Sequence, residues 1–212
     1  MFSRTPQAEP VVFVVDDDIS VRESLELLFR SVGLTTKLFS SAEAFLSHPR
    51  VSAPCCLVLD VTLPDLNGLD LQERIAYERF RVPIIFITGY GDIPMTVKAM
   101  KAGAIEFLSK PFDDEMLLDA VRHAISRSGA ALEDESDLQV IEGCFSALTP
   151  REREVMQLVV SGLINKQIGD ELGISEITVK AHRGRVMQKM HARSLPELVK
   201  IAAKLRLPSP EC

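Results

Sequence analysis

Five short apolar runs in the first 126 residues alternate with segments of helical periodicity, and this alternation constrains the fold more than any other feature. The runs are VVFVV (11–15), TTKLF (35–39), CCLVLD (55–60), PIIFIT (83–88) and AIEFLS (104–109). Apolar strands without a polar face are expected when helices cover both sides of a sheet. Strands that alternate with helices predict a doubly wound α/β fold with a five-stranded parallel sheet.

Segments with helical periodicity separate these runs. After the first run, one helical face holds Val21, Leu25, Leu28, Phe29 and Val32, and Gly33 supplies a stop. Further helices are expected near 42–47, 69–77 and 93–100. A last helix should follow Lys110-Pro111, with an inner face of Leu117, Ala120, Val121, Ala124 and Ile125.

The composition, 46% hydrophobic and 25% charged, is ordinary for a soluble globular protein. No stretch approaches the roughly 18 uncharged apolar residues that a membrane-spanning helix needs. The N-terminal MFSRTPQAEP lacks the apolar core of a secretory signal. The cysteines, Cys55, Cys56, Cys144 and Cys212, show neither metal-ligand spacing nor a disulfide framework. We therefore expect a cytoplasmic protein with reduced thiols and no membrane partner.

The net charge of −6 is unevenly distributed along the chain. Residues 1–126 carry a net charge of −6, residues 127–143 a net charge of −4 and residues 144–212 a net charge of +4. This asymmetry predicts two modules, 10–126 and 144–208, that are joined by an acidic linker at 127–143. The linker could be flexible or could form a short helix. Only the basic module has the charge that favours a phosphate backbone.

Polar side chains stand at the ends of four of the expected strands. These residues are Asp16, Asp17, Asp60, Thr88 and Lys110. In open parallel sheets, ligands bind beyond the carboxyl ends of the strands, so these side chains should converge. Clustered carboxylates suit a hard cation such as Mg²⁺, and a carboxylate can act as a nucleophile toward phosphorus. No glycine-rich phosphate loop follows the first strand, which disfavours a dinucleotide site.

Each of these residues also has a plainer interpretation. A single aspartate at a strand end is usually a turn or cap residue, and Asp18 fits the N-cap of the following helix. Thr88 could belong to a turn, Lys110 could be a solvated charge, and Pro111 could start the last helix. The coincidence of all five at the ends of four strands favours a site.

The motifs VVFVVDDD, VLDVTLPDLNG, IIFITGYGD and AIEFLSKPF resemble the receiver domain of two-component response regulators, over residues 10–126. The resemblance implies a flavodoxin-like fold and a phosphoacceptor at Asp60. It also implies that Mg²⁺ is bound by Asp16, Asp17, Asp60 and the main-chain carbonyl of Thr62.

The same resemblance implies that Thr88 hydrogen-bonds the phosphoryl oxygens and that Lys110 pairs with them. Phe107 occupies the position of an aromatic switch in that family, although plain core packing would place an aromatic residue there as well. The Lys110–Pro111 bond is cis in the family, whereas cis X-Pro bonds are otherwise uncommon.

From Leu148 onward the sequence has no strand-like run, and a small all-α domain is expected. Thr149-Pro150-Arg151-Glu152 has the pattern of a helix start with a capping box. Further helices are expected near 165–172, 176–190 and 195–205, with Gly173 and Ser175 between the first two. Two helices joined by a tight glycine-containing turn, the second rich in cations, form the helix-turn-helix pattern.

The helix expected at 176–190 has two different faces. Val179, His182, Val186 and Met190 should pack inward, with His182 as a structural residue. The opposite face holds Thr178, Lys180, Ala181, Gly184 and Arg185. A recognition helix in the major groove needs this division. Gly184 inside a helix costs about 1 kcal/mol relative to alanine, which suggests that a partner such as DNA approaches the backbone there.

Residues 146–206 resemble the LuxR-type helix-turn-helix, notably in LTPREREVMQLVVSGLINKQIGDELGISEITVKAHR. The whole chain therefore resembles a FixJ/NarL-type response regulator. This implies a sensor histidine kinase and double-stranded DNA as partners, and a homodimer that forms on phosphorylation through residues 92–126. The implied DNA-binding residues are Thr178, Lys180, Ala181, Arg183, Gly184, Arg185 and Lys189. Some relatives have a basic residue at the position of Gly184.

Two alternatives stay open at this point. A haloacid-dehalogenase-type phosphatase also uses aspartate, lysine and Mg²⁺ on a doubly wound sheet, but it usually carries its nucleophile after the first strand. The receiver-like module could also be a phosphate-independent docking unit. In the favoured interpretation the protein is not a dedicated enzyme, and the receiver only assists its own phosphorylation and dephosphorylation.

Overall fold

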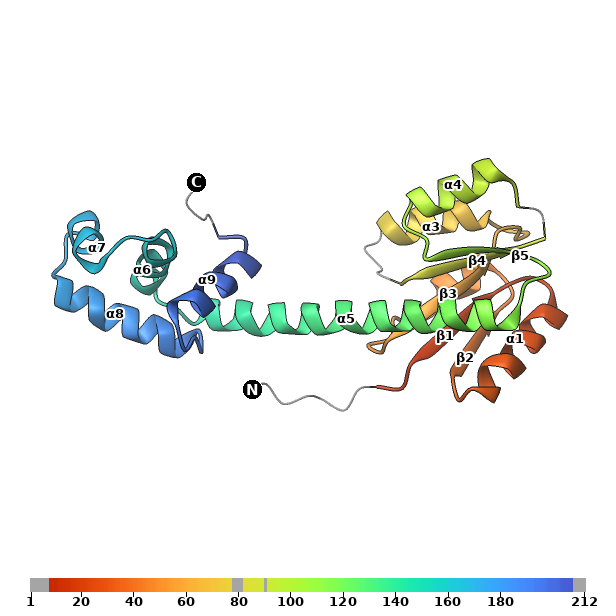
Figure 1. The fold of residues 1–212 in the computed structure, drawn as a ribbon, viewed down its shortest axis with the longest axis horizontal. Helices are drawn as coiled ribbons and strands as arrows, with labels where there is room; N and C mark the ends of the chain where they lie inside the picture. Colours follow the sequence, from red (N-terminus) through yellow and green to blue (C-terminus); the bar gives the residue numbers. More distant parts are fainter. Residues whose placement is uncertain (1–7, 78–81, 90, 208–212) are drawn as a thin grey trace. The chain divides into compact units, whose positions relative to one another are not determined.

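The computed structural model describes residues 8–77, 82–89 and 91–207 (Figure 1). In this part of the chain, a five-stranded parallel sheet has the strand order β2-β1-β3-β4-β5. Its strands are β1 (Val11–Val15), β2 (Thr35–Phe39), β3 (Cys55–Asp60), β4 (Ile84–Thr88) and β5 (Glu106–Ser109). The predicted doubly wound α/β fold is confirmed.

Helices cover both faces of the sheet, which explains why the strands lack a polar face. The helices of this unit are α1 (Ile19–Ser31), α2 (Ala42–Leu46), α3 (Gly68–Tyr77), α4 (Ile93–Lys101) and α5 (Asp114–Ser146). Phe13 and Leu57 face the side covered by α2, α3 and α4. Val14 and Val58 face the other side, which α1 and the first part of α5 cover (Figure 1). Successive residues of one strand therefore supply two separate cores.

Several local expectations were wrong or need adjustment. Val32 does not share the buried face of α1, because it lies at the C-cap and is 43% exposed. Pro111 does not start α5, which begins at Asp114. The cysteines Cys55, Cys56 and Cys144 are free thiols. Cys212 and Pro208, the last residue of the predicted second module, lie outside the described residues.

The predicted linker, 127–143, is part of one continuous helix. α5 runs over 33 residues, and the chain divides into two compact units between Glu133 and Asp134. The first part of α5 buries Leu117, Val121 and Ala124 in the first unit. Ile141 and Phe145 pack against the core of the second unit. The segment is therefore helical and belongs to a helix longer than the short one considered from the sequence, and the two ends of α5 pack in different cores.

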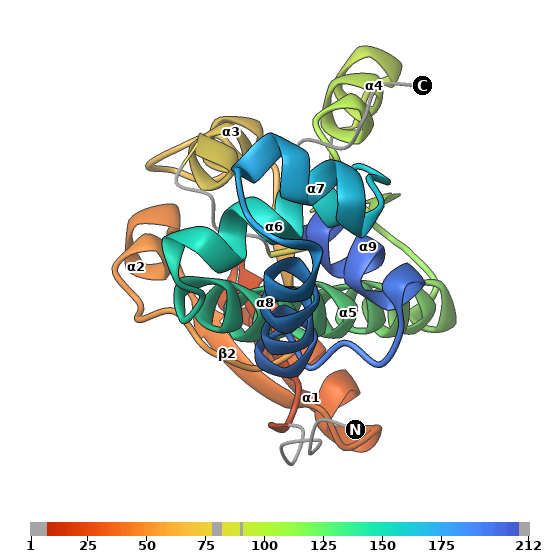
Figure 2. The same ribbon diagram turned by 90° about the vertical axis from the view of Figure 1, so that its left-hand side faces the viewer.

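The second unit is helical, as predicted. It contains the last part of α5 and the helices α6 (Pro150–Val160), α7 (Asn165–Leu172), α8 (Glu176–Lys189) and α9 (Leu195–Lys204) (Figure 2). Thr149 and Glu152 form the predicted capping box of α6, and Ser175 caps α8. Gly173 ends α7 with a positive φ of 65°, a conformation that glycine adopts without steric cost.

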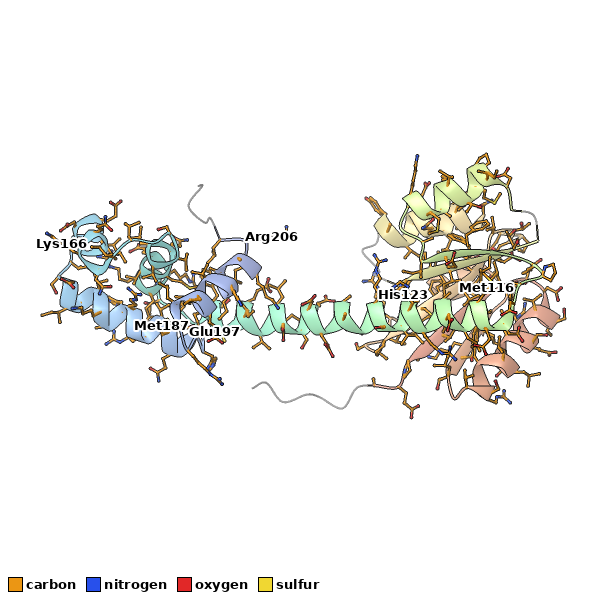
Figure 3. The ribbon with its side chains drawn as sticks, viewed as in Figure 1. Met116, His123, Lys166, Met187, Glu197 and Arg206 are labelled. Atoms are coloured by element: carbon orange, nitrogen blue, oxygen red, sulfur yellow. The ribbon has the colours of Figure 1, made fainter. Side chains whose placement is uncertain are left out.

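α8 packs against α6 and α7 through an apolar core, which includes Val155, Met156, Ile168, Val179, Val186 and Leu198. Met187, labelled in Figure 3, packs against this core from α8, whereas Lys166 on α7 is exposed. The core therefore leaves one side of α8 in solvent. Within the described residues, no helix has the length and hydrophobicity to span a membrane.

An ion pair fixes the end of α8 to the start of α6. Lys189 Nζ lies 2.7 Å from Glu152 Oε2, and the Glu152 side chain is 3% exposed. The backbone N–H of Thr149 also donates to Glu152 Oε2 at 2.9 Å. Hydrogen bonds from Lys189 and Thr149 lower the pKa of Glu152 to about 2. The charged form of Glu152 therefore stabilises the second unit.

We predict that Glu152→Gln lowers the free energy of unfolding of the second unit by about 2 kcal/mol, the typical value for a hydrogen bond to a charged group. Because the pKa of Glu152 is depressed, this contribution should be complete above pH 4.5 and be lost as the pH falls toward about 2. Thermal denaturation of both proteins, followed by circular dichroism at several pH values, measures the difference. A difference that grows as the pH falls would contradict the assignment.

Candidate functional site

The carboxyl ends of four neighbouring strands bring the predicted polar residues together. Asp16 follows β1, Asp60 ends β3, Thr88 ends β4 and Lys110 follows β5. The site lies beside the boundary between β1 and β3, where the strand order reverses direction. Asp16 and Thr88 are fully buried and Asp60 is 7% exposed. Parallel pairing of the strands thus explains why residues 94 positions apart form one site.

Lys110 bridges the two buried carboxylates. Its Nζ donates to Asp16 Oδ2 at 2.7 Å and to Asp60 Oδ2 at 2.9 Å. Its backbone N–H donates to the carbonyl of Thr88 at 2.7 Å, and the Lys110–Pro111 peptide bond is cis, as the resemblance implied. Lys110 is therefore part of the site and is not a solvated surface charge.

Burial and pairing have opposite effects on these charges. Burial raises the pKa of Asp16, and the hydrogen bonds from Lys110 and from the backbone N–H of Asp18 offset this only in part. Burial also disfavours the Lys110 ammonium, but its hydrogen bonds to Asp16 and Asp60 outweigh that effect and raise the pKa of Lys110. The lysine is thus held in its charged form between the two carboxyl groups.

The carboxylates form a group of hard oxygen donors. One oxygen from each of Asp16, Asp17 and Asp60 lies within 4.8 Å of the others, and Asp17 is exposed. One lysine does not balance three carboxylates, and oxygen donors at this spacing fit a Mg²⁺ ion that keeps some of its water ligands. The backbone N–H of Thr62 donates to Asp60 Oδ1 at 3.0 Å, which places the Thr62 main chain beside the acceptor carboxylate.

The side chains of Phe107 and Thr88 both lie close to Gly91. A Cβ added at Gly91 would lie 2.8 Å from Phe107 Cε1 and 3.1 Å from Thr88 Cγ2. The Phe107 ring is half-buried, and its centroid lies 6.0 Å from that of Phe86. Both side chains thus lie against Gly91, and a side chain at that position would collide with them.

Two further residues shape the site and were not singled out from the sequence. A Cβ added at Gly68 would lie 2.5 Å from the carbonyl oxygen of Asp60 and 3.0 Å from Val61 Cα. Gly68 therefore lets the start of α3 approach the end of β3. Arg22 Nη1 donates to the carbonyl of Asp16 at 2.6 Å. Gly68 was visible in the motif PDLNG, whereas nothing in the sequence marks Arg22.

In the second unit, α8 has the two faces that were predicted. Val179, Val186 and Met190 are buried, and His182 is half-buried. On the other side, the exposed residues are Lys180, Ala181, Gly184 and Arg185, with Thr178 half-exposed. A Cβ added at Gly184 would meet no described atom within 4 Å, so packing within this unit does not require a glycine there.

Two of the cations predicted to contact DNA bind residues outside α8, whereas Lys180 pairs with Glu176 within α8 at 3.1 Å. Arg183 Nη1 donates to Asn165 Oδ1 at 3.0 Å, and Lys189 forms the ion pair with Glu152. Gly169, which the sequence analysis did not single out, allows the tight approach of α7 and α8, because a Cβ there would lie 2.7 Å from the carbonyl oxygen of Ile174.

Comparison with protein families gives two matches. Residues 12–122 match the response regulator receiver domain, and residues 146–202 match the bacterial regulatory proteins of the LuxR family. Together they cover the sheet from residue 12 onward, the helices α1–α4, the first part of α5, the helices α6–α8 and most of α9. Neither match favours the phosphatase alternative.

Individual relatives resemble this chain over most of its length and most of their own. Nodulation protein W of Bradyrhizobium diazoefficiens is 53% identical over 195 residues, which are 92% of this chain and 86% of that protein. Response regulator protein TmoT of Ectopseudomonas mendocina is 46% identical over 93% of this chain and 90% of its own. The solved structure of response regulator StyR is 50% identical, with a TM-score of 0.82, and covers 93% of this chain and 100% of that chain.

We predict that Gly68→Ala destabilises the first unit by at least about 2 kcal/mol, because backbone atoms must move to admit the Cβ. Gly143→Ala is the matched control, since a Cβ there would meet no described atom within 4 Å. This control should raise helix stability by up to about 1 kcal/mol. Urea denaturation of the full chain measures both effects, and equal stabilities for the two variants would contradict the prediction.

Proposed function

The chain belongs to the response regulators that join a receiver domain to a LuxR-type DNA-binding domain, and on this premise we propose that Asp60 accepts a phosphoryl group from a sensor histidine kinase. The observation that carries the proposal is the position of Lys110 Nζ between Asp16 Oδ2 and Asp60 Oδ2. A carboxylate held in this way beside a cation is suited to transfer of a negatively charged group.

The proposed transfer forms one O–P bond and breaks one P–N bond. A carboxylate oxygen of Asp60 attacks the phosphorus atom of a phosphohistidine, the P–N bond breaks, and the imidazole leaves with the electron pair. The product is an acyl phosphate on Asp60. Hydrogen bonds from Lys110 to Oδ2 and from the Thr62 N–H to Oδ1 orient the carboxylate. Lys110 stays charged and balances the added phosphoryl charge.

Asp16, Asp17, Asp60 and the main-chain carbonyl of Thr62 are the proposed Mg²⁺ ligands. When bound, Mg²⁺ supplies a Lewis acid that stabilises the transferring phosphoryl group. The fit rests on the three carboxylate oxygens within 4.8 Å of one another.

Thr88 and Phe107 are proposed to transmit the change. The Thr88 hydroxyl would hydrogen-bond a phosphoryl oxygen and so move toward Asp60. Because the Thr88 methyl group and the Phe107 ring both lie against Gly91, a shift of Thr88 leaves space for the ring to follow. Phosphorylation then shifts an equilibrium between two receiver conformations.

The active conformation is proposed to dimerise through residues 92–126. Large apolar side chains are exposed there, namely Ile93, Val97 and Met100 on α4. Met116 on α5, labelled in Figure 3, is exposed as well. Two copies then bind double-stranded DNA at two half-sites about one helical turn apart. The DNA-facing residues are proposed to be Thr178, Lys180, Ala181, Gly184 and Arg185, whereas Arg183 and Lys189 hold α8 to its neighbours. As a regulator of transcription, the protein would act in the cytoplasm.

We predict that Asp17→Asn lowers the affinity for Mg²⁺ at least tenfold, because it removes one of the charged oxygen ligands. Asp18→Asn is the matched control. The Asp18 carboxylate caps α1 through Ser20 N at 2.8 Å, and asparagine caps helices equally well. Isothermal titration calorimetry with MgCl₂ measures both affinities, and a similar loss in the two variants would exclude a specific role for Asp17.

We predict that acetyl phosphate with Mg²⁺ converts the wild-type chain to a dimer and raises its affinity for DNA, whereas Asp60→Asn stays monomeric under the same conditions. Analytical ultracentrifugation measures the oligomeric state, and fluorescence anisotropy with labelled genomic promoter fragments measures binding. Equal DNA binding by treated and untreated wild-type protein would support the phosphate-independent docking alternative.

A further inference from the structure

The first turn of α8 carries a large apolar side chain in solvent. Ile177 is 80% exposed, whereas Val179, two residues later, is fully buried in the core of the second unit. Exposed single apolar residues are common on protein surfaces, so the position of Ile177 on the helix decides whether it has a role.

Ile177 lies on the same face of α8 as the proposed DNA-facing residues. Residues 177, 180, 181 and 184 are separated by three, four and seven positions, and a helix places such positions on one side. All four are exposed. The buried residues Val179 and Val186 lie on the other side. Ile177, Lys180, Ala181 and Gly184 therefore form one exposed stripe along α8, and Ile177 is its first residue.

The surroundings of Ile177 favour close contact with a base pair. Recognition helices contact base edges through their N-terminal residues, and Ile177 is the second residue of α8. Ala181 and Gly184 have small or no side chains, so they allow this face to lie deep in a groove. Lys180 is paired with Glu176 at 3.1 Å, which keeps the Lys180 ammonium near the same end of the helix.

The chemistry of the side chain restricts what it can recognise. Isoleucine neither donates nor accepts a hydrogen bond. In the major groove, the apolar group that a base pair offers is the C5-methyl group of thymine. We propose that Ile177 is a specificity-determining residue that packs against a thymine methyl group and so selects an A·T pair at one position of each half-site. This inference rests on the proposed DNA-binding function.

The first experiment selects binding sites from a duplex library with a randomised 20-base-pair core, using the full-length chain with Mg²⁺ and acetyl phosphate. Wild-type protein should enrich sites with a fixed A·T pair in each half-site. Ile177→Ala should lose the preference at that position and keep the others. Leu27→Ala in α1 is the matched control, since Leu27 is a 63% exposed apolar residue of the first unit.

The second experiment removes the methyl group from the DNA. Replacing the selected thymine by deoxyuridine should weaken wild-type binding about fourfold per half-site, the ratio expected for one buried methyl-sized group. The same replacement should not weaken binding by Ile177→Ala further, because the two changes remove one contact. Circular dichroism melting checks that the variant is folded, and its melting temperature should be unchanged.

Two negative results would have different meanings. If the wild-type chain enriches no sequence, the DNA-binding proposal fails and this inference fails with it. If the wild type enriches a site but Ile177→Ala enriches the same site with the same preferences, and deoxyuridine has no effect, only the inference is overturned. Ile177 would then be a surface residue or a contact for another protein.

Discussion

The contact of the Lys110 ammonium with Asp16 and Asp60 is the interaction on which the proposed phosphoryl transfer depends. Two carboxylates buried at the end of a sheet repel each other, and their charged forms are costly without a partner. Lys110 donates to both at 2.7 and 2.9 Å, and a third carboxylate, Asp17, remains exposed nearby. The group as a whole stays negative, so it attracts a cation. With that cation and Lys110 in place, a phosphoryl group can be accommodated.

The second unit contains a lysine–carboxylate pair with a different role. Glu152 and Lys189 are also joined at 2.7 Å, but no cluster of further carboxylates surrounds them among the described residues. The backbone N–H of Thr149 completes the hydrogen bonds of Glu152. This pair links α8 to α6, and the apolar core between these helices leaves one side of α8 in solvent. The first ion pair thus belongs to the proposed phosphorylation site, while the second lies in the unit that carries the proposed DNA-binding surface.

The fold and most of the candidate site could be predicted from the sequence, because both follow from local patterns. Apolar runs predicted the strands, and parallel pairing then required Asp16, Asp60 and Lys110 to meet. Contacts between distant segments could not be predicted in this way. Lys189 looked like a DNA-facing cation, since nothing local shows that Glu152, 37 residues earlier, is its partner. The composition of 127–143 suggested a linker, yet this segment lies within α5, whose two ends pack in different cores. The role of Gly68 depends on a backbone approach that only the folded chain shows.

The most direct test of the central claim is the intact mass of the full chain after incubation with Mg²⁺ and acetyl phosphate, beside the Asp60→Asn variant. We expect the wild type to gain one phosphoryl group, about 80 Da, in a Mg²⁺-dependent reaction. The variant should gain none, because it lacks the nucleophilic carboxylate that Lys110 and Thr62 hold in place. A variant that gains the same mass as the wild type would show that Asp60 is not the acceptor.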